Sequence, residues 1–255
     1  MDKTAIAKIV ITSATVVPED GREDKTPVAV VPKDVLDKAV ASKPFQNWLA
    51  SVSERYVVKS VKFQSVDLFG PQKNVGFIKF VAEVFDSNDK FIPGIVFMRG
   101  GAVGMLPVLN CNGKKYTILT VQPRVATGRF DFEEIPAGML DGSGNFGGVA
   151  AKELKEELDV TISEADLIDL TAFAGYSGGA FVSPGGTDET LRLFAYEKDV
   201  TEEELASYEG KCTGLIEEGE SIVLKIVELD TLWKVDDMKT VVAYTLYQKY
   251  VESQK

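Results

Sequence analysis

Two apolar runs on either side of an Asn-Gly pair constrain the fold of this chain most strongly. Residues 101–125 form two strand-like segments, and Asn112-Gly113 separates them. Asn-Gly is a strong signal for the tight turn of a β-hairpin, because both residues tolerate a positive φ angle. We therefore predict a hairpin over this segment.

Before the hairpin, the chain shows one helical and two strand patterns. Residues 31–52 carry apolar side chains at helical intervals, and residues 55–69 and 74–85 alternate between apolar and polar side chains as strands do. Residues 1–26 are polar, with a charge cluster, and predict a frayed arm or an edge strand. The first part of the chain is therefore expected to be a small α+β region.

After the hairpin, strands and helices continue to alternate. A strand leads into a glycine-rich loop and then into a strongly periodic helix at residues 148–158. Ser163 with Asp166, and Thr201 with Glu204, resemble helix N-terminal caps. The remaining predicted elements are strands at 166–176, 189–200 and 221–229 and an amphipathic helix at 236–252. Together these patterns predict the α+β class.

Histidine is absent from all 255 residues. An imidazole base, an imidazole metal ligand and a Ser-His-Asp triad are therefore excluded. Acid-base chemistry must fall to carboxylates, Lys, Tyr or metal-bound water. Cys111 and Cys212 are too few for a disulfide framework and lack zinc-ligand spacing, so we interpret both as ordinary small residues.

The net charge of −11 is unevenly distributed, because residues 97–255 hold 27 acidic and only 15 basic side chains. This balance argues against nucleic acid or an anionic membrane surface as a partner. It suits either a cation site or an acidic solvated surface. No apolar run is as long as a membrane span, and the N-terminus lacks the features of a signal peptide. We expect a cytoplasmic protein.

Two glycine motifs suggest enzyme classes that the rest of the sequence does not support. Gly142-x-Gly144-x-x-Gly147 matches a dinucleotide fingerprint, but PAGMLD separates it from the preceding strand and no series of βα units surrounds it. An oxidoreductase is therefore a minor alternative, which predicts NAD binding without metal. Gly175-x-Ser177-x-Gly179 copies a nucleophile elbow, which needs a histidine that this chain lacks.

The helix AAKELKEEL presents three carboxylates on one face. Glu153, Glu156 and Glu157 are spaced at i, i+3 and i+4. Like charges at this spacing destabilise an isolated helix by about 0.2–0.5 kcal/mol, which a bound divalent cation would reverse. Carboxylate oxygens, water and phosphate are the ligands that Mg²⁺ prefers. The alternative is a solvated helix face, which is common in Lys/Glu-rich helices.

The spacing around this helix resembles the Nudix hydrolase box. That box is written as Gly, five residues, Glu, seven residues, then Arg-Glu-aliphatic-x-Glu-Glu-x-Gly-aliphatic. Three positions depart from it, since Gly144 stands for Glu, Lys152 for Arg and Asp159 for Gly. The positions that match are Gly138, Glu153, Leu154, Glu156, Glu157 and Val160.

Motifs outside the box resemble the ADP-sugar diphosphatase branch, which includes ADP-ribose, ADP-glucose and UDP-glucose pyrophosphatases. The likeness is greatest to the chloroplast-type members, which carry an extra N-terminal region. The motifs are Gln122-x-Arg124, Glu134-x-Pro136-Ala137-Gly138, Ser183-Pro184-Gly185-Gly186-x-Asp188-Glu189, Glu218-Gly219-Glu220 and Asp237-x-Lys239-Thr240.

The resemblance implies an architecture. Residues 98–255 would form a Nudix α/β/α sandwich with a mixed sheet, preceded by the small α+β region at residues 1–97. In related enzymes that region packs against a second subunit, so we expect a homodimer.

The resemblance also implies a reaction, the hydrolysis of the pyrophosphate bond of a nucleoside diphosphate sugar to a nucleoside monophosphate and a sugar phosphate. Mg²⁺ is the expected cofactor, with Mn²⁺ as the alternative. The sugar and the nucleobase are left open. A nucleotide-sugar binding or sensor module without turnover is the rival hypothesis, motivated by Gly144 and Lys152.

Site residues follow from the same resemblance. The expected metal ligands are Glu153, Glu156, Glu157 and the backbone carbonyl of Ala137. Glu189 is the candidate general base, and Glu156 is expected to take part in catalysis. The residues expected to bind substrate are Arg124, Glu134 and Gly138. On the residues alone, Glu189 could instead cap a turn, Arg124 could be a surface residue, and Glu134 could pair with Arg124 or Arg129.

Overall fold

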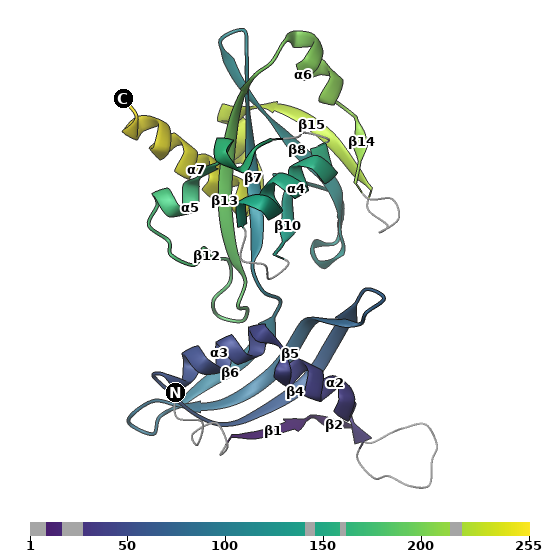
Figure 1. Cartoon of the computed structure of the whole chain (residues 1–255), viewed down its shortest axis with the longest axis vertical. Helices are drawn as coiled ribbons and strands as arrows, with labels where there is room; N and C mark the ends of the chain where they lie inside the picture. The colour runs from purple at the N-terminus through teal and green to yellow at the C-terminus, as the bar shows by residue number, and fades with distance from the viewer. Residues whose placement is uncertain (1–8, 17–27, 141–145, 159–161, 215–220) are drawn as a thin grey trace. The chain divides into compact units, whose positions relative to one another are not determined.

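A computed structural model of the chain describes residues 9–16, 28–140, 146–158, 162–214 and 221–255. The chain forms two compact units (Figure 1). One comprises Met1–Gly100 and Val182–Glu189, and the other comprises Gly101–Phe181 and Thr190–Lys255. A short segment from the second half of the sequence therefore belongs to the first unit.

The first unit contains a four-stranded sheet in the order β1-β4-β5-β6. β1 runs parallel to β4, and the other pairs are antiparallel. β1 confirms the predicted edge strand, although residues 1–8 and 17–27 lie outside the described residues. Its strands are β1 (Val10–Ser13), β4 (Val57–Phe69), β5 (Asn74–Phe85) and β6 (Phe91–Met98), with β2 (Thr15–Val16) and β3 (Val28–Ala29) paired separately.

The helical pattern at residues 31–52 forms two helices, α2 (Lys33–Ala41) and α3 (Lys43–Ser53). Ser42 between them has an extended backbone, with ψ of 141°. Pro44 explains the break, because its ring lacks an N–H and would clash with the carbonyl four residues earlier in a continuous helix.

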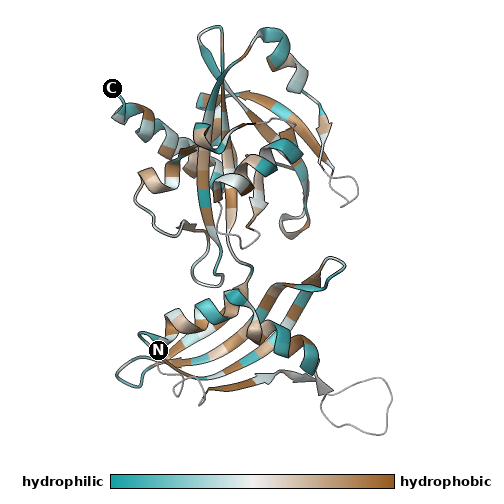
Figure 2. Cartoon of the chain, viewed as in Figure 1, coloured by the Kyte–Doolittle hydropathy of each residue, from teal (hydrophilic) through white to brown (hydrophobic). Residues whose placement is uncertain are grey.

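The helices of the first unit cover one face of its sheet around an aromatic core. Phe45 and Trp48 of α3 contact Phe63 and Phe80 of the sheet, with ring centroids 4.6–5.8 Å apart. Figure 2 shows the apolar residues along the strands of this sheet. This packing gives the unit a hydrophobic core of its own.

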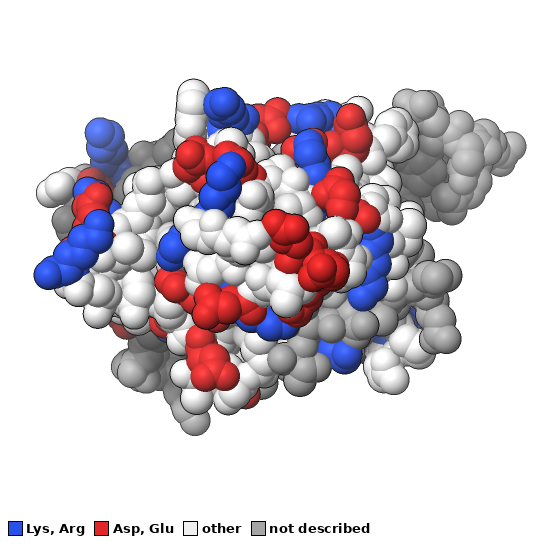
Figure 3. Space-filling view, turned by 90° about the horizontal axis from the view of Figure 1, so that it is seen from above, with Lys and Arg blue, Asp and Glu red and all other residues white. Residues whose placement is uncertain are grey.

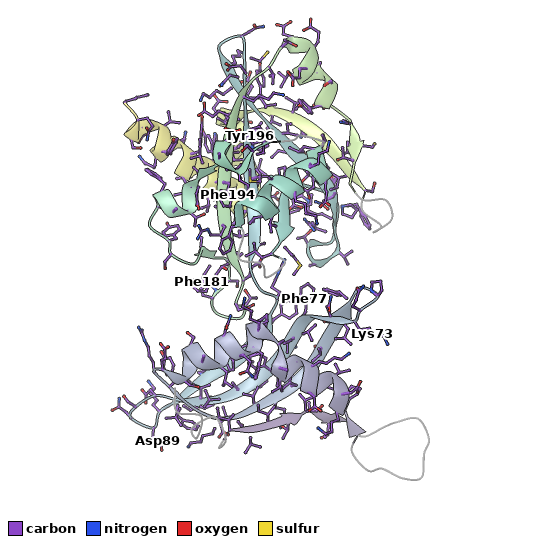
Figure 4. All side chains as sticks on the ribbon, in the orientation of Figure 1. Lys73, Phe77, Asp89, Phe181, Phe194 and Tyr196 are labelled. Carbon is purple, nitrogen blue, oxygen red and sulfur yellow. The ribbon has the colours of Figure 1, made fainter. Side chains whose placement is uncertain are left out.

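Tight turns join the strands of both units. Lys73 and Asp89, labelled in Figure 4, have φ angles of 52° and 59° in the β4–β5 and β5–β6 turns. In the second unit, Asn112 and Gly113 have φ angles of 49° and 77°. The hairpin predicted around Asn112-Gly113 is therefore confirmed.

The second unit contains a mixed sheet in the order β11-β13-β7-β8-β15-β14. β13 pairs in parallel with β7, whereas β7 pairs antiparallel with β8. Its strands are β7 (Ala102–Cys111), β8 (Lys114–Arg124), β9 (Arg129–Glu134), β10 (Ala137–Met139), β11 (Ile168–Asp169), β12 (Ala180–Phe181), β13 (Thr190–Asp199), β14 (Cys212–Thr213) and β15 (Ile222–Glu228).

Helices cover both faces of this sheet. Alternate residues of the sheet, including Phe194 and Tyr196 (Figure 4), pack in one cluster with Val149 and Leu158 of α4. α7 contacts β7 and β13 as well. The helical segments are α4 (Phe146–Leu158), α5 (Leu170–Phe173), α6 (Glu202–Tyr208), α7 (Met238–Ser253), η1 (Val125–Thr127), η2 (Glu164–Asp166) and η4 (Leu229–Lys234). The predicted α/β/α sandwich with a mixed sheet is confirmed.

Tyr247 ties α7 to the sheet through polar contacts. Its hydroxyl donates to Glu197 at 2.5 Å and accepts from Lys115 Nζ at 2.6 Å. Burial and the Glu197 carboxylate raise the pKa of Tyr247, so the hydroxyl stays protonated and can donate.

The prediction of a strand over residues 166–176 is wrong for most of that segment. After the two residues of β11, the chain forms α5, because the Asp169 carboxylate accepts a hydrogen bond from Ala172 N at 2.8 Å and caps a helical turn. The strand expected at 189–200 is confirmed as β13, and the helix expected at 148–158 begins two residues earlier as α4.

The surface carries charges of both signs. Figure 3 shows acidic and basic side chains interspersed on the face that it views. Within the described part of the chain, no helix has the length and apolar character needed to cross a membrane.

Candidate active site

The helix α4 brings one predicted metal ligand against another. The Glu157 carboxylate is buried, with 5% of the residue exposed, and its Oε2 accepts a hydrogen bond from Ala137 N at 3.2 Å. Ala137 opens β10, which pairs with β7. A buried carboxylate requires hydrogen bonds or a cation, so this contact fastens the box helix to the strand that carries the Ala137 carbonyl.

Glu156 lies on the same helix and is partly buried. Its Oε1 lies 3.5 Å from Lys152 Nζ, one turn earlier, and 25% of the Glu156 side chain is exposed. Lys152 stands where the box has Arg, and a partly exposed pair of this kind contributes little to stability. Lys152 therefore contacts Glu156 through a single ammonium group.

Several positions of the Nudix-box resemblance lie outside the part of the chain that the structure describes. Glu153 lies on α4, one turn before Glu157, but its side chain is outside the described part of the structure. Gly144, Asp159, Val160 and the motif at 218–220 also lie outside the described residues.

The donors of α4 fit a hard divalent cation. Among the described side chains, which exclude that of Glu153, no three acidic or thiol groups converge on one point. Glu157 and Glu156 are described, and the helical repeat places the backbone of Glu153 beside that of Glu157. The set consists of oxygen donors, which Mg²⁺ and Mn²⁺ accept.

Glu134 forms the center of a second polar cluster. It ends β9 and is 3% exposed. Each of its carboxylate oxygens forms an ion pair with one basic side chain. Arg124 Nε lies 2.6 Å from Oε1, and Lys239 Nζ contacts Oε2. The structure therefore pairs Glu134 with Arg124 rather than with Arg129, which binds Asp236 at 2.5 Å.

Lys239 is a residue that we did not predict for the site. The signal for it was the motif Asp237-x-Lys239-Thr240 at the start of the last helix. Asp237 caps α7 by accepting hydrogen bonds from Thr240 N at 3.0 Å and Thr240 Oγ1 at 2.6 Å. Ile135 N donates to Thr240 Oγ1 at 3.0 Å, so α7 is joined to the chain beyond β9.

Gly138 lies on β10 directly after Ala137 and pairs with Val103 of β7. Glu189, the candidate base, belongs to the first unit.

Glu189 ends a loop that is bonded to the end of β6. Its carboxylate lies 3.3 Å from Arg99 Nη1, and 16% of its side chain is exposed. The neighbouring Asp188 accepts hydrogen bonds from the backbone N–H groups of Arg99, at 2.8 Å, and Gly100, at 3.1 Å. Phe97 N donates to Gly186 O at 2.8 Å. The loop that carries the candidate base is therefore held by contacts to Phe97, Arg99 and Gly100 of the first unit.

A family model described as the NUDIX domain matches residues 98–246. The match covers more than half of the chain and includes α4, β10 and the Glu134 cluster. The chain therefore belongs to the Nudix family, and the hydrolase class expected from the sequence is supported at this level.

Two individual proteins are similar to this chain. Nudix hydrolase 14, chloroplastic, from Arabidopsis thaliana is 40% identical over 223 residues, which cover 82% of this chain and 71% of that protein. A crystal structure described as an ADP compounds hydrolase superposes with a TM-score of 0.51 at 15% identity, over 76% of this chain and 95% of that one. At that identity, the second comparison supports the fold alone.

Proposed function

We propose that this chain hydrolyses the pyrophosphate bond of a nucleoside diphosphate sugar, such as ADP-ribose or ADP-glucose, to a nucleoside monophosphate and a sugar phosphate. The observation that carries the proposal is the contact between buried Glu157 and Ala137, which joins two of the expected metal ligands within a NUDIX domain. The similarity to a protein named a Nudix hydrolase supports it.

The chain would divide the chemistry among three groups of residues. Glu153, Glu156, Glu157 and the Ala137 carbonyl would hold Mg²⁺, or Mn²⁺ in its place. When bound, such an ion neutralises phosphate charge and lowers the pKa of water. Arg124 would bind phosphate oxygens, with Glu134 and Gly138 beside the substrate, and Glu189 would accept the proton of the attacking water.

Product analysis tests this proposal. Purified protein would be incubated with ADP-ribose, ADP-glucose and UDP-glucose, with and without Mg²⁺, and nucleoside monophosphate would be quantified. We expect AMP or UMP only when the metal is present, and the ranking of substrates would identify the sugar and the base. Absence of a monophosphate from every substrate would contradict the proposal.

A binding or sensor module is the second candidate. It is favoured by Gly144 in place of the box Glu, and by Lys152, which contacts Glu156 where the box has a bidentate Arg. Such a module would bind an ADP-sugar in calorimetry without releasing AMP.

The assembly and location expected from the sequence remain proposals. We infer that residues 1–97 mediate a homodimer and that residues 98–255 form the hydrolase domain. Light scattering is expected to give the mass of two chains, and a monomer mass would contradict the dimer. The cytoplasmic location also remains a proposal, since one similar protein is named chloroplastic.

Removing the Asp188 carboxylate is expected to slow turnover without weakening substrate binding. Asp188→Ala loses both hydrogen bonds that anchor the loop next to Glu189. A misplaced proton acceptor lowers the rate, and we expect kcat to fall about tenfold with KM within about twofold of wild type. Steady-state kinetics measures this.

Asp86→Ala is the matched control for Asp188→Ala. Asp86 also accepts two backbone hydrogen bonds in the first unit, from Asn88 N at 2.8 Å and Lys90 N at 2.9 Å, but it lies in the β5–β6 turn. An equal loss of kcat in both variants would show that general loosening of the unit, and not the anchoring of the loop, is responsible.

A further inference from the structure

We propose that Lys239 is a positioning residue that acts through Glu134 to keep the Arg124 guanidinium available for substrate phosphate. This inference rests on the proposed function, because Arg124 is the phosphate-binding candidate. It assigns a role to the start of α7, which lies about a hundred residues beyond the strand that ends in Glu134.

The geometry of the Arg124–Glu134 pair leaves the two terminal nitrogens of the Arg124 guanidinium free of Glu134. Glu134 Oε1 contacts Nε, on the side of the guanidinium, at 2.6 Å. Its other oxygen is held by Lys239. The two terminal nitrogens of Arg124 are therefore not taken by Glu134, and 41% of the Arg124 side chain is exposed. Those nitrogens form the fork that binds phosphate oxygens in a bidentate manner.

Lys239 is itself fixed in place by acidic groups. Its ammonium contacts Glu134 and lies 3.2 Å from Asp237 Oδ1, and only 12% of its side chain is exposed. Asp237 is bonded to Thr240, and Thr240 accepts a hydrogen bond from Ile135 N. The residue after Glu134 is thus tied to the same helical turn that carries Lys239, which closes a ring of contacts and sets the position of the ammonium.

The charges explain why Lys239 matters for a ligand that it does not touch. Arg124 and Lys239 together balance Glu134 and Asp237. Without the ammonium, Glu134 Oε2 is free to take a second N–H from Arg124 and form a bidentate pair with it. That change removes a donor from phosphate, which weakens binding of the pyrophosphate.

Lys225 offers a matched control. Its Nζ lies 2.6 Å from Glu133 Oε1, so it forms a Lys–Glu pair with the residue that precedes Glu134 on β9. The Lys225 and Glu133 side chains are 43% and 33% exposed, and neither belongs to the Glu134 cluster. Lys225→Met therefore removes the same chemical group from a neighbouring ion pair.

The test measures binding of the α,β-methylene analogue of ADP-ribose, which resists hydrolysis, by calorimetry in Mg²⁺. We expect Lys239→Met to raise Kd about tenfold, the effect of losing one charged hydrogen bond. Lys239→Arg restores the charge and should bind within about threefold of wild type, and Lys225→Met within about twofold. In substrate turnover, KM should rise more than kcat falls.

The double variant distinguishes action through Arg124 from other roles. Arg124→Met alone should weaken binding at least as much as Lys239→Met, and adding Lys239→Met to it should cause no further loss. A further tenfold loss in the double variant, or unchanged Kd in Lys239→Met, would overturn the inference. If Lys239→Met does not fold, Lys239→Gln, which is polar but uncharged and one atom shorter than Lys, takes its place with the same expected Kd.

Failure of the inference and failure of the proposed function give different results. Binding of the analogue that depends on Lys239, with no AMP released from ADP-ribose, would contradict the hydrolase and leave the inference standing. AMP release with unchanged Kd in Lys239→Met and Lys239→Gln would contradict the inference alone. Wild-type protein that does not bind the analogue would contradict both.

Discussion

Glu157→Gln is expected to lower kcat for an ADP-sugar by about 10³-fold, which corresponds to about 4 kcal/mol of transition-state stabilisation. In the wild type, Ala137 N donates a hydrogen bond to Glu157 Oε2 at 3.2 Å. Gln has the same size as Glu and keeps an oxygen that can accept this bond. The substitution therefore removes the negative charge that the proposed metal site would use, while preserving the link between α4 and β10.

The measurement is AMP formation over a range of Mg²⁺ concentrations, with circular dichroism to verify the fold. Weakened metal binding predicts that high Mg²⁺ recovers part of the lost activity. Glu252→Gln is the control, because Glu252 lies on α7, is exposed, and forms an ion pair with Lys249. Wild-type turnover in Glu157→Gln would remove Glu157 from the proposed metal site.

Elements specified by local chemistry could be predicted from the sequence. The Asn112-Gly113 turn and the periodic α4 depend on residues close together along the chain, and both are present where expected. Two details have equally local reasons. Pro44 divides the helical pattern at 31–52 into two helices, and Asp169 caps a helical turn where a strand was expected at 166–176. Apolar periodicity outweighed these single-residue signals in the prediction.

The site was predictable in its parts and not in its connections. The motifs identified Arg124 and Glu134, but no pattern shows that Lys239, 105 residues after Glu134, binds the second oxygen of that carboxylate. The same holds for Asp188, whose hydrogen bonds span 88 and 89 residues to the end of β6. Pairings over such distances are set by how the elements pack, which a motif does not encode.

Phe80→Ala is expected to destabilise the first unit by about 3–5 kcal/mol, the usual cost of removing a large aromatic side chain from a core. Phe80 is fully buried, and its ring lies 4.6 Å from Trp48, 5.7 Å from Phe45 and 5.8 Å from Phe63 between centroids. Alanine would leave a cavity lined by three rings whose positions depend on one another. Phe91→Ala is the control, since Phe91 is 54% exposed on the same sheet and its loss should cost about 1 kcal/mol or less.

The two tryptophans allow the unfolding of each unit to be followed separately. Trp48 lies in the core of the first unit, and Trp233 is 64% exposed in η4 of the second. Denaturant titration of Phe80→Ala in a Trp233→Phe background should show the full loss through Trp48 fluorescence. In a Trp48→Phe background, the Trp233 transition should stay within about 0.5 kcal/mol, because Phe80 belongs to the core cluster of the first unit. An equal shift of both transitions would mean that the two cores unfold as one cooperative unit, even though each has its own buried cluster.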